Sequence, residues 1–141
     1  GANTHGQLCL DNGGNPQRIA TKIIDDDILS FAAGWQSSYI LHDNGSILSC
    51  GLNSDGQLGD GTFNDSFSTF VQLNDTSSDI IDVYAGPSAK SAFFKAQDGK
   101  LYSTGLNDRG QLGVGNKDNS NVPMEVDFNS VSSAQTEWVV T

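Results

Sequence analysis

Residues 51–61, GLNSDGQLGDG, set carboxylate and amide oxygens among glycines, which is the composition of a calcium-binding loop. An EF-hand loop has its glycine at position six, so Gly56 would place Gly51 at position one and Thr62 at position twelve. Both positions normally hold a carboxylate, and no helical pattern flanks the segment. We therefore interpret the segment as a turn and expect no metal ligands; calcium binding stays the alternative.

Catalytic chemistry finds little support in the positions of the reactive side chains. His5 and His42 lie in unrelated parts of the chain, and no serine stands in a GxSxG elbow. The aspartates follow no spacing rule, which is typical of solvated surface. We expect no catalytic and no cofactor-binding residue, and we rank an enzyme third among the functional hypotheses.

Two cysteines, Cys9 and Cys50, are too few for a disulfide framework and lack the CxxC spacing of a zinc or redox site. The rarity of disulfides in reducing compartments favours buried free thiols over a disulfide. Asn-x-Ser/Thr sequons at Asn44, Asn64 and Asn74 fall on predicted turns and would allow glycosylation if the chain were secreted. The sequence leaves both the compartment and the redox state open.

The net charge of the chain favours some classes of binding partner over others. Seventeen acidic and seven basic residues give a formal net charge of −10. Phosphate binding needs clustered Lys and Arg, so direct nucleic-acid binding is disfavoured and a basic protein partner suits the chain better. No apolar run approaches the roughly 18 residues of a membrane span, so we expect no membrane insertion.

The opening segment recurs through the chain. GLNDRGQLGVG repeats it at 105–115, and GANTHGQLCLD is a degraded copy at 1–11. We call 1–11, 51–61 and 105–115 the first, second and third anchor segments. Their first residues are 50 and 54 positions apart, which is the period of a propeller blade or a solenoid unit.

Each unit between anchor segments contains four short apolar runs, and Asn-Gly or Asp-Gly separates the last two, a strong hairpin signal. We predict four antiparallel strands per unit, the first of them in NPQRIATKII (15–24), STFVQL (68–73) and NVPMEVDF (121–128). Further strands are predicted near 28–33, 38–42, 46–50, 80–85, 91–96 and 100–104. No sustained helical period is present, which disfavours an α-solenoid.

The pattern GxNxxGQLGxG, followed by an apolar-Ala-Gly segment, a short strand, a DG turn and the next GxN, resembles the repeat of the regulator of chromosome condensation family. Members of this family form seven-bladed β-propellers. The resemblance implies an all-β fold of four-stranded antiparallel blades in a partial propeller. One region, 1–141, would hold two full units, about 1–50 and 51–104, and about three quarters of a third, 105–141.

The resemblance also implies structural roles for the anchor segments. Their glycines would supply positive-φ or crowded turn positions, and their asparagines would bond nearby backbone. Leu58 and Leu112 would fill the space between neighbouring blades. The motif positions are Gly51, Asn53, Gly56, Gln57, Leu58 and Gly59 in the second segment and Gly105, Asn107, Gly110, Gln111, Leu112 and Gly113 in the third.

Functionally, the sequence favours a non-enzymatic protein–protein interaction module or scaffold subunit. Its partners would be other protein chains of a larger assembly or the remainder of its own propeller, because an unfinished sheet stack must cover its ends. Candidate contacts are Trp35, Trp138, Val139 and Val140. The alternative, from the founding member of the family, is a guanine-nucleotide exchange factor-like regulator of a small GTPase.

Overall fold

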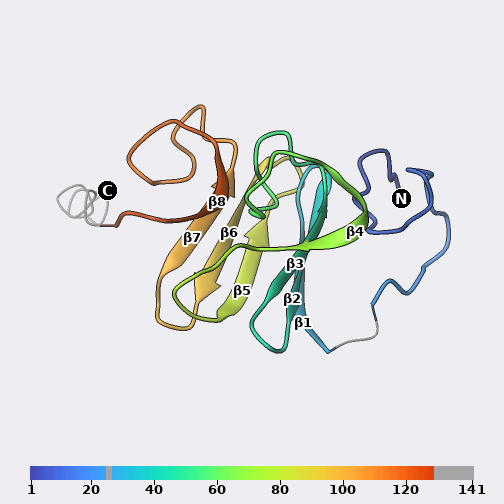
Figure 1. Ribbon diagram of the computed structural model, residues 1–141, viewed down its shortest axis with the longest axis horizontal. Helices are drawn as coiled ribbons and strands as arrows, with labels where there is room; N and C mark the ends of the chain where they lie inside the picture. Colours follow the sequence, from blue (N-terminus) through green and yellow to red (C-terminus); the bar gives the residue numbers. More distant parts are fainter. Residues whose placement is uncertain (25–26, 129–141) are drawn as a thin grey trace, which may run out of the picture.

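The computed structural model describes residues 1–24 and 27–128, and in this part of the chain it contains strands and no helix. The strands are β1 (Ile28–Ala33), β2 (Ser37–His42), β3 (Ile47–Gly51), β4 (Ser66–Gln72), β5 (Ile80–Ala85), β6 (Ser91–Ala96), β7 (Leu101–Gly105) and β8 (Ser120–Glu125). β1–β4 form one four-stranded antiparallel sheet and β5–β8 a second, each in chain order (Figure 1). The all-β prediction is confirmed, and so are the seven strands predicted between residues 28 and 104 and the strand predicted in 121–128.

The predicted hairpin turns are where the sequence places them. Gly45 joins β2 to β3 and Gly99 joins β6 to β7, with φ values of 82° and 90° that suit glycine. The turns are closed by backbone hydrogen bonds from His42 N–H to the Ser46 carbonyl (3.0 Å) and from Ala96 N–H to the Lys100 carbonyl (2.9 Å).

The sheets do not coincide with the sequence units. β4 comes from the unit that begins at Gly51, yet it pairs with β3 at the edge of the first sheet, and β8 pairs with β7 in the same way. The four runs of one unit therefore do not form one sheet: three enter its own sheet and the first completes the sheet before it. The strand predicted in 15–24 is wrong, because that segment is irregular.

The core lies between the two sheets. Tyr39 and Leu41 of β2 face Ala92 and Phe94 of β6, and the rings of Tyr39 and Phe94 meet edge to face with centroids 6.0 Å apart. All four side chains are buried. Two like sheets stacked face to face are the arrangement of neighbouring propeller blades.

The expectation of free thiols at Cys9 and Cys50 is wrong, because the structure joins the two residues in a disulfide. Cys50 lies in β3, and Cys9 lies in the N-terminal segment, residues 1–24, which passes over the face of the first sheet turned away from the second (Figure 1). The two Cα atoms are 5.5 Å apart, a normal separation for a disulfide. The bond ties the N-terminal segment to the sheet.

Candidate interaction surfaces

Each anchor segment is organised by one fully buried asparagine, at Asn3, Asn53 and Asn107. The Oδ1 atom of Asn53 accepts a hydrogen bond from the Leu58 backbone N–H (2.9 Å), and its Nδ2 donates to the carbonyl of Thr62 (3.0 Å). The same acceptor bond joins Asn3 to Leu8 and Asn107 to Leu112. The expected bonds from these asparagines to nearby backbone are therefore present.

The second anchor segment lies between the two sheets. Leu58 is fully buried and belongs to the core that both sheets share, as expected, and Leu112 is also fully buried. The preceding carbonyl, of Gln57, accepts hydrogen bonds from the Tyr39 hydroxyl of β2 and the Thr104 hydroxyl of β7, both at 2.9 Å. Burial raises the pKa of Tyr39 well above its usual value, which keeps the hydroxyl a donor.

The residues at the start of β8, which belong to the next unit, close over the second anchor segment. Asn119 Nδ2 donates to Asp55 Oδ1 at 3.2 Å. The backbone at Gly56 approaches Ser120 so closely that an added Cβ would lie 2.7 Å from the Ser120 carbonyl oxygen. We call this contact, between an anchor segment and the residues that lead into the outer strand of the next unit, a clamp.

The first anchor segment is held by an equivalent clamp. His5 Nδ1 lies 3.1 Å from Asp65 Oδ2, and the other Asp65 oxygen accepts the Asn53 backbone N–H at 2.7 Å. A Cβ at Gly6 would overlap the carbonyl oxygen of Ser66. In both clamps the fifth residue of one anchor segment therefore meets an Asp or Asn that precedes the outer strand of the next unit.

The third anchor segment has no such covering strand within the described residues. A Cβ at Gly110 would have its nearest neighbour, the Asn116 carbonyl oxygen, at 3.9 Å. Gln111 is exposed, whereas Gln57 at the same position of the second segment is 1% exposed. Arg109 occupies the fifth position, which in the other two segments contacts the next unit. This segment presents one half of a clamp.

In each sheet, the face turned away from the other sheet also exposes apolar side chains. Phe31 pairs with Ile40 in the first sheet as Val83 pairs with Phe94 in the second. Val83 is 4% exposed because its face packs on the first sheet, whereas Phe31 is 78% exposed. On the far face of the second sheet, Tyr84 is 47% exposed. Each sheet therefore has an apolar face positioned for a further sheet.

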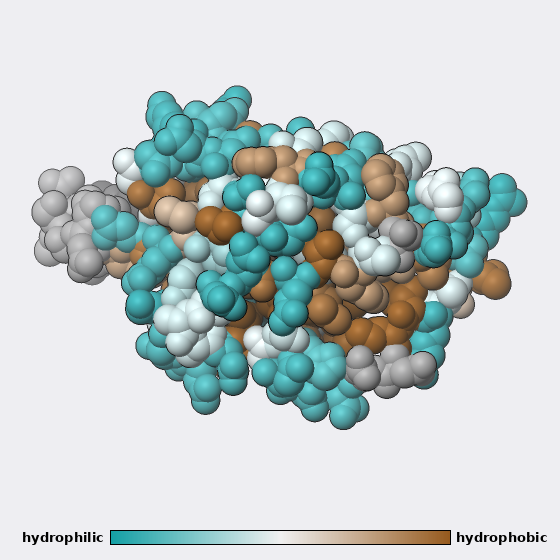
Figure 2. Space-filling view, in the orientation of Figure 1, coloured by the Kyte–Doolittle hydropathy of each residue, from teal (hydrophilic) through white to brown (hydrophobic). Residues whose placement is uncertain are grey.

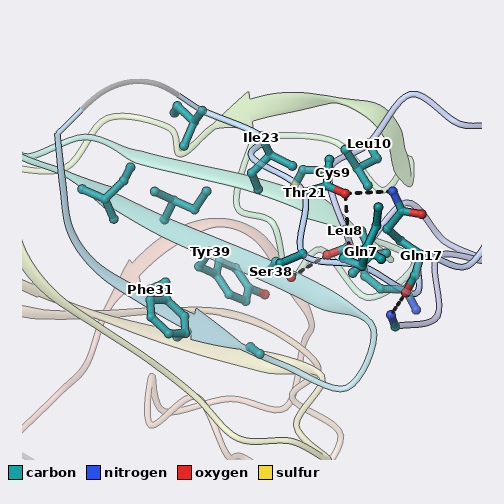
Figure 3. A pocket seen from close by; sticks show the side chains of 18 of the residues that line it. Gln7, Leu8, Cys9, Leu10, Gln17, Thr21, Ile23, Phe31, Ser38 and Tyr39 are labelled. Carbon is teal, nitrogen blue, oxygen red and sulfur yellow. Dashed lines mark hydrogen bonds between the residues drawn. The ribbon is translucent and has the colours of Figure 1, made fainter.

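A groove of about 590 Å³ separates the N-terminal segment from β1 and β2. Figure 3 shows side chains of both walls, and Figure 2 shows apolar side chains gathered in this part of the surface. The apolar lining includes Leu8, Leu10, Ile19, Ile23, Phe31 and Ile40. The sequence pattern does not predict this groove, because residues 15–24 have the composition of a strand. The isoleucines of that segment are the feature that could have indicated an apolar wall.

Trp35, a candidate partner contact, is half-exposed beside the second sheet. The Lys90 ammonium lies 4.7 Å from the centre of its ring and 3.6 Å from Asp55 Oδ2. The indole is therefore held in a cation–π contact while the side chain stays half-exposed. The other candidate contacts, Trp138, Val139 and Val140, lie outside the described residues.

Within 1–24 and 27–128, no group of three or more His, Cys, Asp or Glu side chains is arranged to hold a metal ion. The same residues include no helix long and apolar enough to cross a membrane. The two histidines contact different residues. His5 belongs to the first clamp, and His42 Nδ1 lies 2.8 Å from Asp43 Oδ1.

Sequence comparison matches the family described as regulator of chromosome condensation (RCC1) repeat twice, over residues 28–57 and 98–139. The X-linked retinitis pigmentosa GTPase regulator of Mus musculus is 33% identical over 130 residues, which are 89% of this chain and 13% of the mouse protein. The Canis lupus familiaris protein of the same name is 31% identical over the same length and the same shares. The chain therefore spans about an eighth of these relatives.

Solved structures share the fold. Human WBSCR16 is 27% identical, with a TM-score of 0.74 over 92% of this chain and 34% of that one. Prp20p of Saccharomyces cerevisiae, whose structure was described together with its binding properties to Gsp1p and histones, is 25% identical, with a TM-score of 0.73 over the same shares. Yeast RCC1 (Prp20) bound to Kap60 is 24% identical, with a TM-score of 0.76 over 92% of this chain and 32% of that one.

Proposed function

This chain is built from repeats of the regulator of chromosome condensation family, and we propose that it is a non-enzymatic protein–protein interaction module or scaffold subunit. Its partners are other protein chains of a larger assembly or the remainder of its own propeller. The region 1–141 acts as one run of units, about 1–50, 51–104 and 105–141. The protein partners named for yeast RCC1 support an interaction role for this fold.

The open third anchor segment carries this proposal. Two clamps show what completes an anchor segment: an Asp or Asn side chain opposite its fifth residue and an extended backbone crossing its glycine. The third segment offers Arg109 and Gly110 for the same contacts. A guanidinium at this position favours a carboxylate, so the partner should present an Asp or Glu immediately before an extended strand.

Cross-linking of the protein in its native assembly tests the proposal. Lys117 lies just after the third anchor segment and Lys22 lies in the N-terminal segment, whereas Lys100 lies in the turn between β6 and β7. We expect cross-links to partner chains or to further repeat units from Lys117 and Lys22 and none from Lys100. Cross-links from Lys100 alone would contradict the assignment of the docking surfaces.

A second candidate function is regulation of a small GTPase, with the chain acting in the manner of a nucleotide exchange factor. The observation that favours it is the name of the mammalian relatives, which are GTPase regulators. Release of a fluorescent guanine nucleotide from a panel of small GTPases separates the two candidates. Acceleration by residues 1–141 would support the exchange factor, and unchanged release rates across the panel would support the interaction module.

A further inference from the structure

The three asparagines that begin glycosylation sequons lie at the surface. Asn44 lies in the turn between β2 and β3, Asn64 lies in the loop before β4, and Asn74 follows β4. All three are exposed. Each is followed at the second position by a hydroxyl residue, at Ser46, Ser66 and Thr76.

The amide nitrogens of these asparagines are not used to hold the fold. The Asn44 side chain forms its hydrogen bonds through Oδ1, which accepts one from the Ser46 backbone N–H (2.9 Å) and one from the Ser46 hydroxyl (2.6 Å). Buried Asn53, in contrast, directs both N–H groups of Nδ2 toward protein acceptors, on Asp60 and Thr62. A sugar on Nδ2 of Asn44 would therefore leave the turn intact, whereas the anchor asparagines could not accept one.

The disulfide between Cys9 and Cys50 independently indicates the kind of cellular compartment in which the chain folds. It crosslinks the N-terminal segment to β3 and uses both cysteines of the chain. Disulfides form and persist in oxidising environments and are rare where glutathione and thioredoxin keep thiols reduced. In eukaryotic cells, the oxidising compartment in which secreted chains form disulfides is also the one in which N-linked glycans are attached.

We propose that this protein folds in an oxidising secretory compartment and carries N-linked glycans on Asn44, Asn64 and Asn74. The donor is an oligosaccharide on a polyisoprenyl pyrophosphate. The Asn Nδ2 forms a bond to the anomeric carbon of the first sugar, the bond from that carbon to the pyrophosphate oxygen breaks, the amide nitrogen loses one proton to a base, and the lipid pyrophosphate leaves.

The positions of two of these sites agree with the proposed interaction role. Asn44 and Asn74 line one shallow groove at the end of the sheets, together with Leu73 and Asp79. That groove shares none of its lining with the groove behind β1, nor does it include the third anchor segment. Asn44 and Asn74 therefore lie outside the third anchor segment, where the partner is proposed to dock, and outside the groove behind β1.

Mass spectrometry of the protein isolated from its native cells tests the proposal. One sample is alkylated without reductant and then treated with a peptide-N-glycosidase in heavy-oxygen water, which converts each glycosylated Asn to labelled Asp. A parallel sample without the glycosidase corrects for spontaneous deamidation. Asn12, which precedes Gly13 but has no sequon, is the internal control, as Asn44 also precedes a glycine.

The expected result is glycosidase-dependent label on the three sequon asparagines, none on Asn12, and alkylation of Cys9 and Cys50 only after reduction. Label on at least one sequon together with protected cysteines upholds the secretory assignment. Unlabelled asparagines at all three sites, or alkylation of the cysteines without reductant, would overturn it. Neither outcome depends on whether the protein has the proposed interaction role.

Discussion

At the scale of single residues, the anchor asparagines and leucines decide the shape of the loops. Asn53 has no exposed surface, and its side chain satisfies the Leu58 N–H and the Thr62 carbonyl at once. A buried polar group must keep its hydrogen bonds, so a substitution that removes them leaves the backbone groups unpaired. Leu58 in turn fills the space between the sheets.

Replacement of Asn53 by alanine should lower the free energy of unfolding by about 1–3 kcal/mol, because the Leu58 N–H and the Thr62 carbonyl lose their buried partner. Asn64→Ala is the control, since Asn64 is exposed and should change stability by less than about 0.5 kcal/mol. Urea unfolding followed by circular dichroism measures both. Equal losses for the two variants would refute the organising role of Asn53.

Leu58→Ala should lower the free energy of unfolding by about 2–4 kcal/mol, since it opens a cavity between two sheets. The matched control is Leu29→Ala, because Leu29 is 63% exposed at the irregularity in the β1–β2 pairing. The same urea titration compares them. A neutral Leu58→Ala would show that the leucine does not fill this space.

At the scale of elements, the clamps explain how successive units are held together. Each outer strand, β4 or β8, belongs in sequence to one unit and in space to the sheet before it. The residues that open this strand also close over the preceding anchor segment. Neighbouring units are therefore joined by strand pairing and by the clamp as well as by the core.

Gly56→Ala and Gly110→Ala separate the clamp from backbone strain. Both glycines have positive φ, 83° and 78°, so alanine is strained at both positions. Only the Cβ at position 56 would also collide with the Ser120 carbonyl. Gly56→Ala should therefore lose at least about 1 kcal/mol more in thermal or urea unfolding than Gly110→Ala; equal losses would show that the clamp contributes nothing.

Reduction of the disulfide should release the N-terminal segment from the first sheet. Removal of a crosslink that spans 41 residues should lower the free energy of unfolding by about 4 kcal/mol on chain-entropy grounds. Limited proteolysis should cut residues 11–24 faster in reductant. The Cys9→Ser, Cys50→Ser double variant is the control: its cleavage should be fast and indifferent to reductant, and protection of the segment in that variant would contradict the prediction.

Local patterns in the sequence predict the strands and hairpins well, because an Asn-Gly or Asp-Gly between apolar runs determines its own turn. Contacts between distant segments are not encoded in such patterns. The pairing of β4 with β3, the clamp between Asp55 and Asn119, and the disulfide all depend on which elements meet in space. Cys9 shows this most clearly: it replaces a motif glycine, keeps a positive φ of 55°, and pairs with β3.

At the scale of the whole molecule, the two sheets stack head to tail. The Val83 face of the second sheet packs on the Tyr39 face of the first, so the two surfaces in contact are different. Such a contact leaves one unmatched face at each end of a pair of sheets, so it can be repeated at both ends of the stack. Phe31 and Tyr84 mark the two outward faces, and Arg109 and Gly110 mark the clamp that the described residues leave open.

Phe31→Glu should weaken any contact made by the outward face of the first sheet, because a carboxylate there would have to be buried without a partner. Phe63→Glu is the matched control, since Phe63 is also exposed but lies in the loop before β4. Sedimentation of the two variants measures the effect. Identical association of both variants would exclude the outward face of the first sheet as a docking surface.

The most direct test of the central claim, that these blades need a covering partner, is the mass of residues 1–141 in solution, measured by light scattering over a range of concentrations. The exposed sheet faces and the open clamp predict a mass above that of the monomer, which rises with concentration. A stable, monodisperse monomer at every concentration, with a single cooperative unfolding transition, would contradict the account.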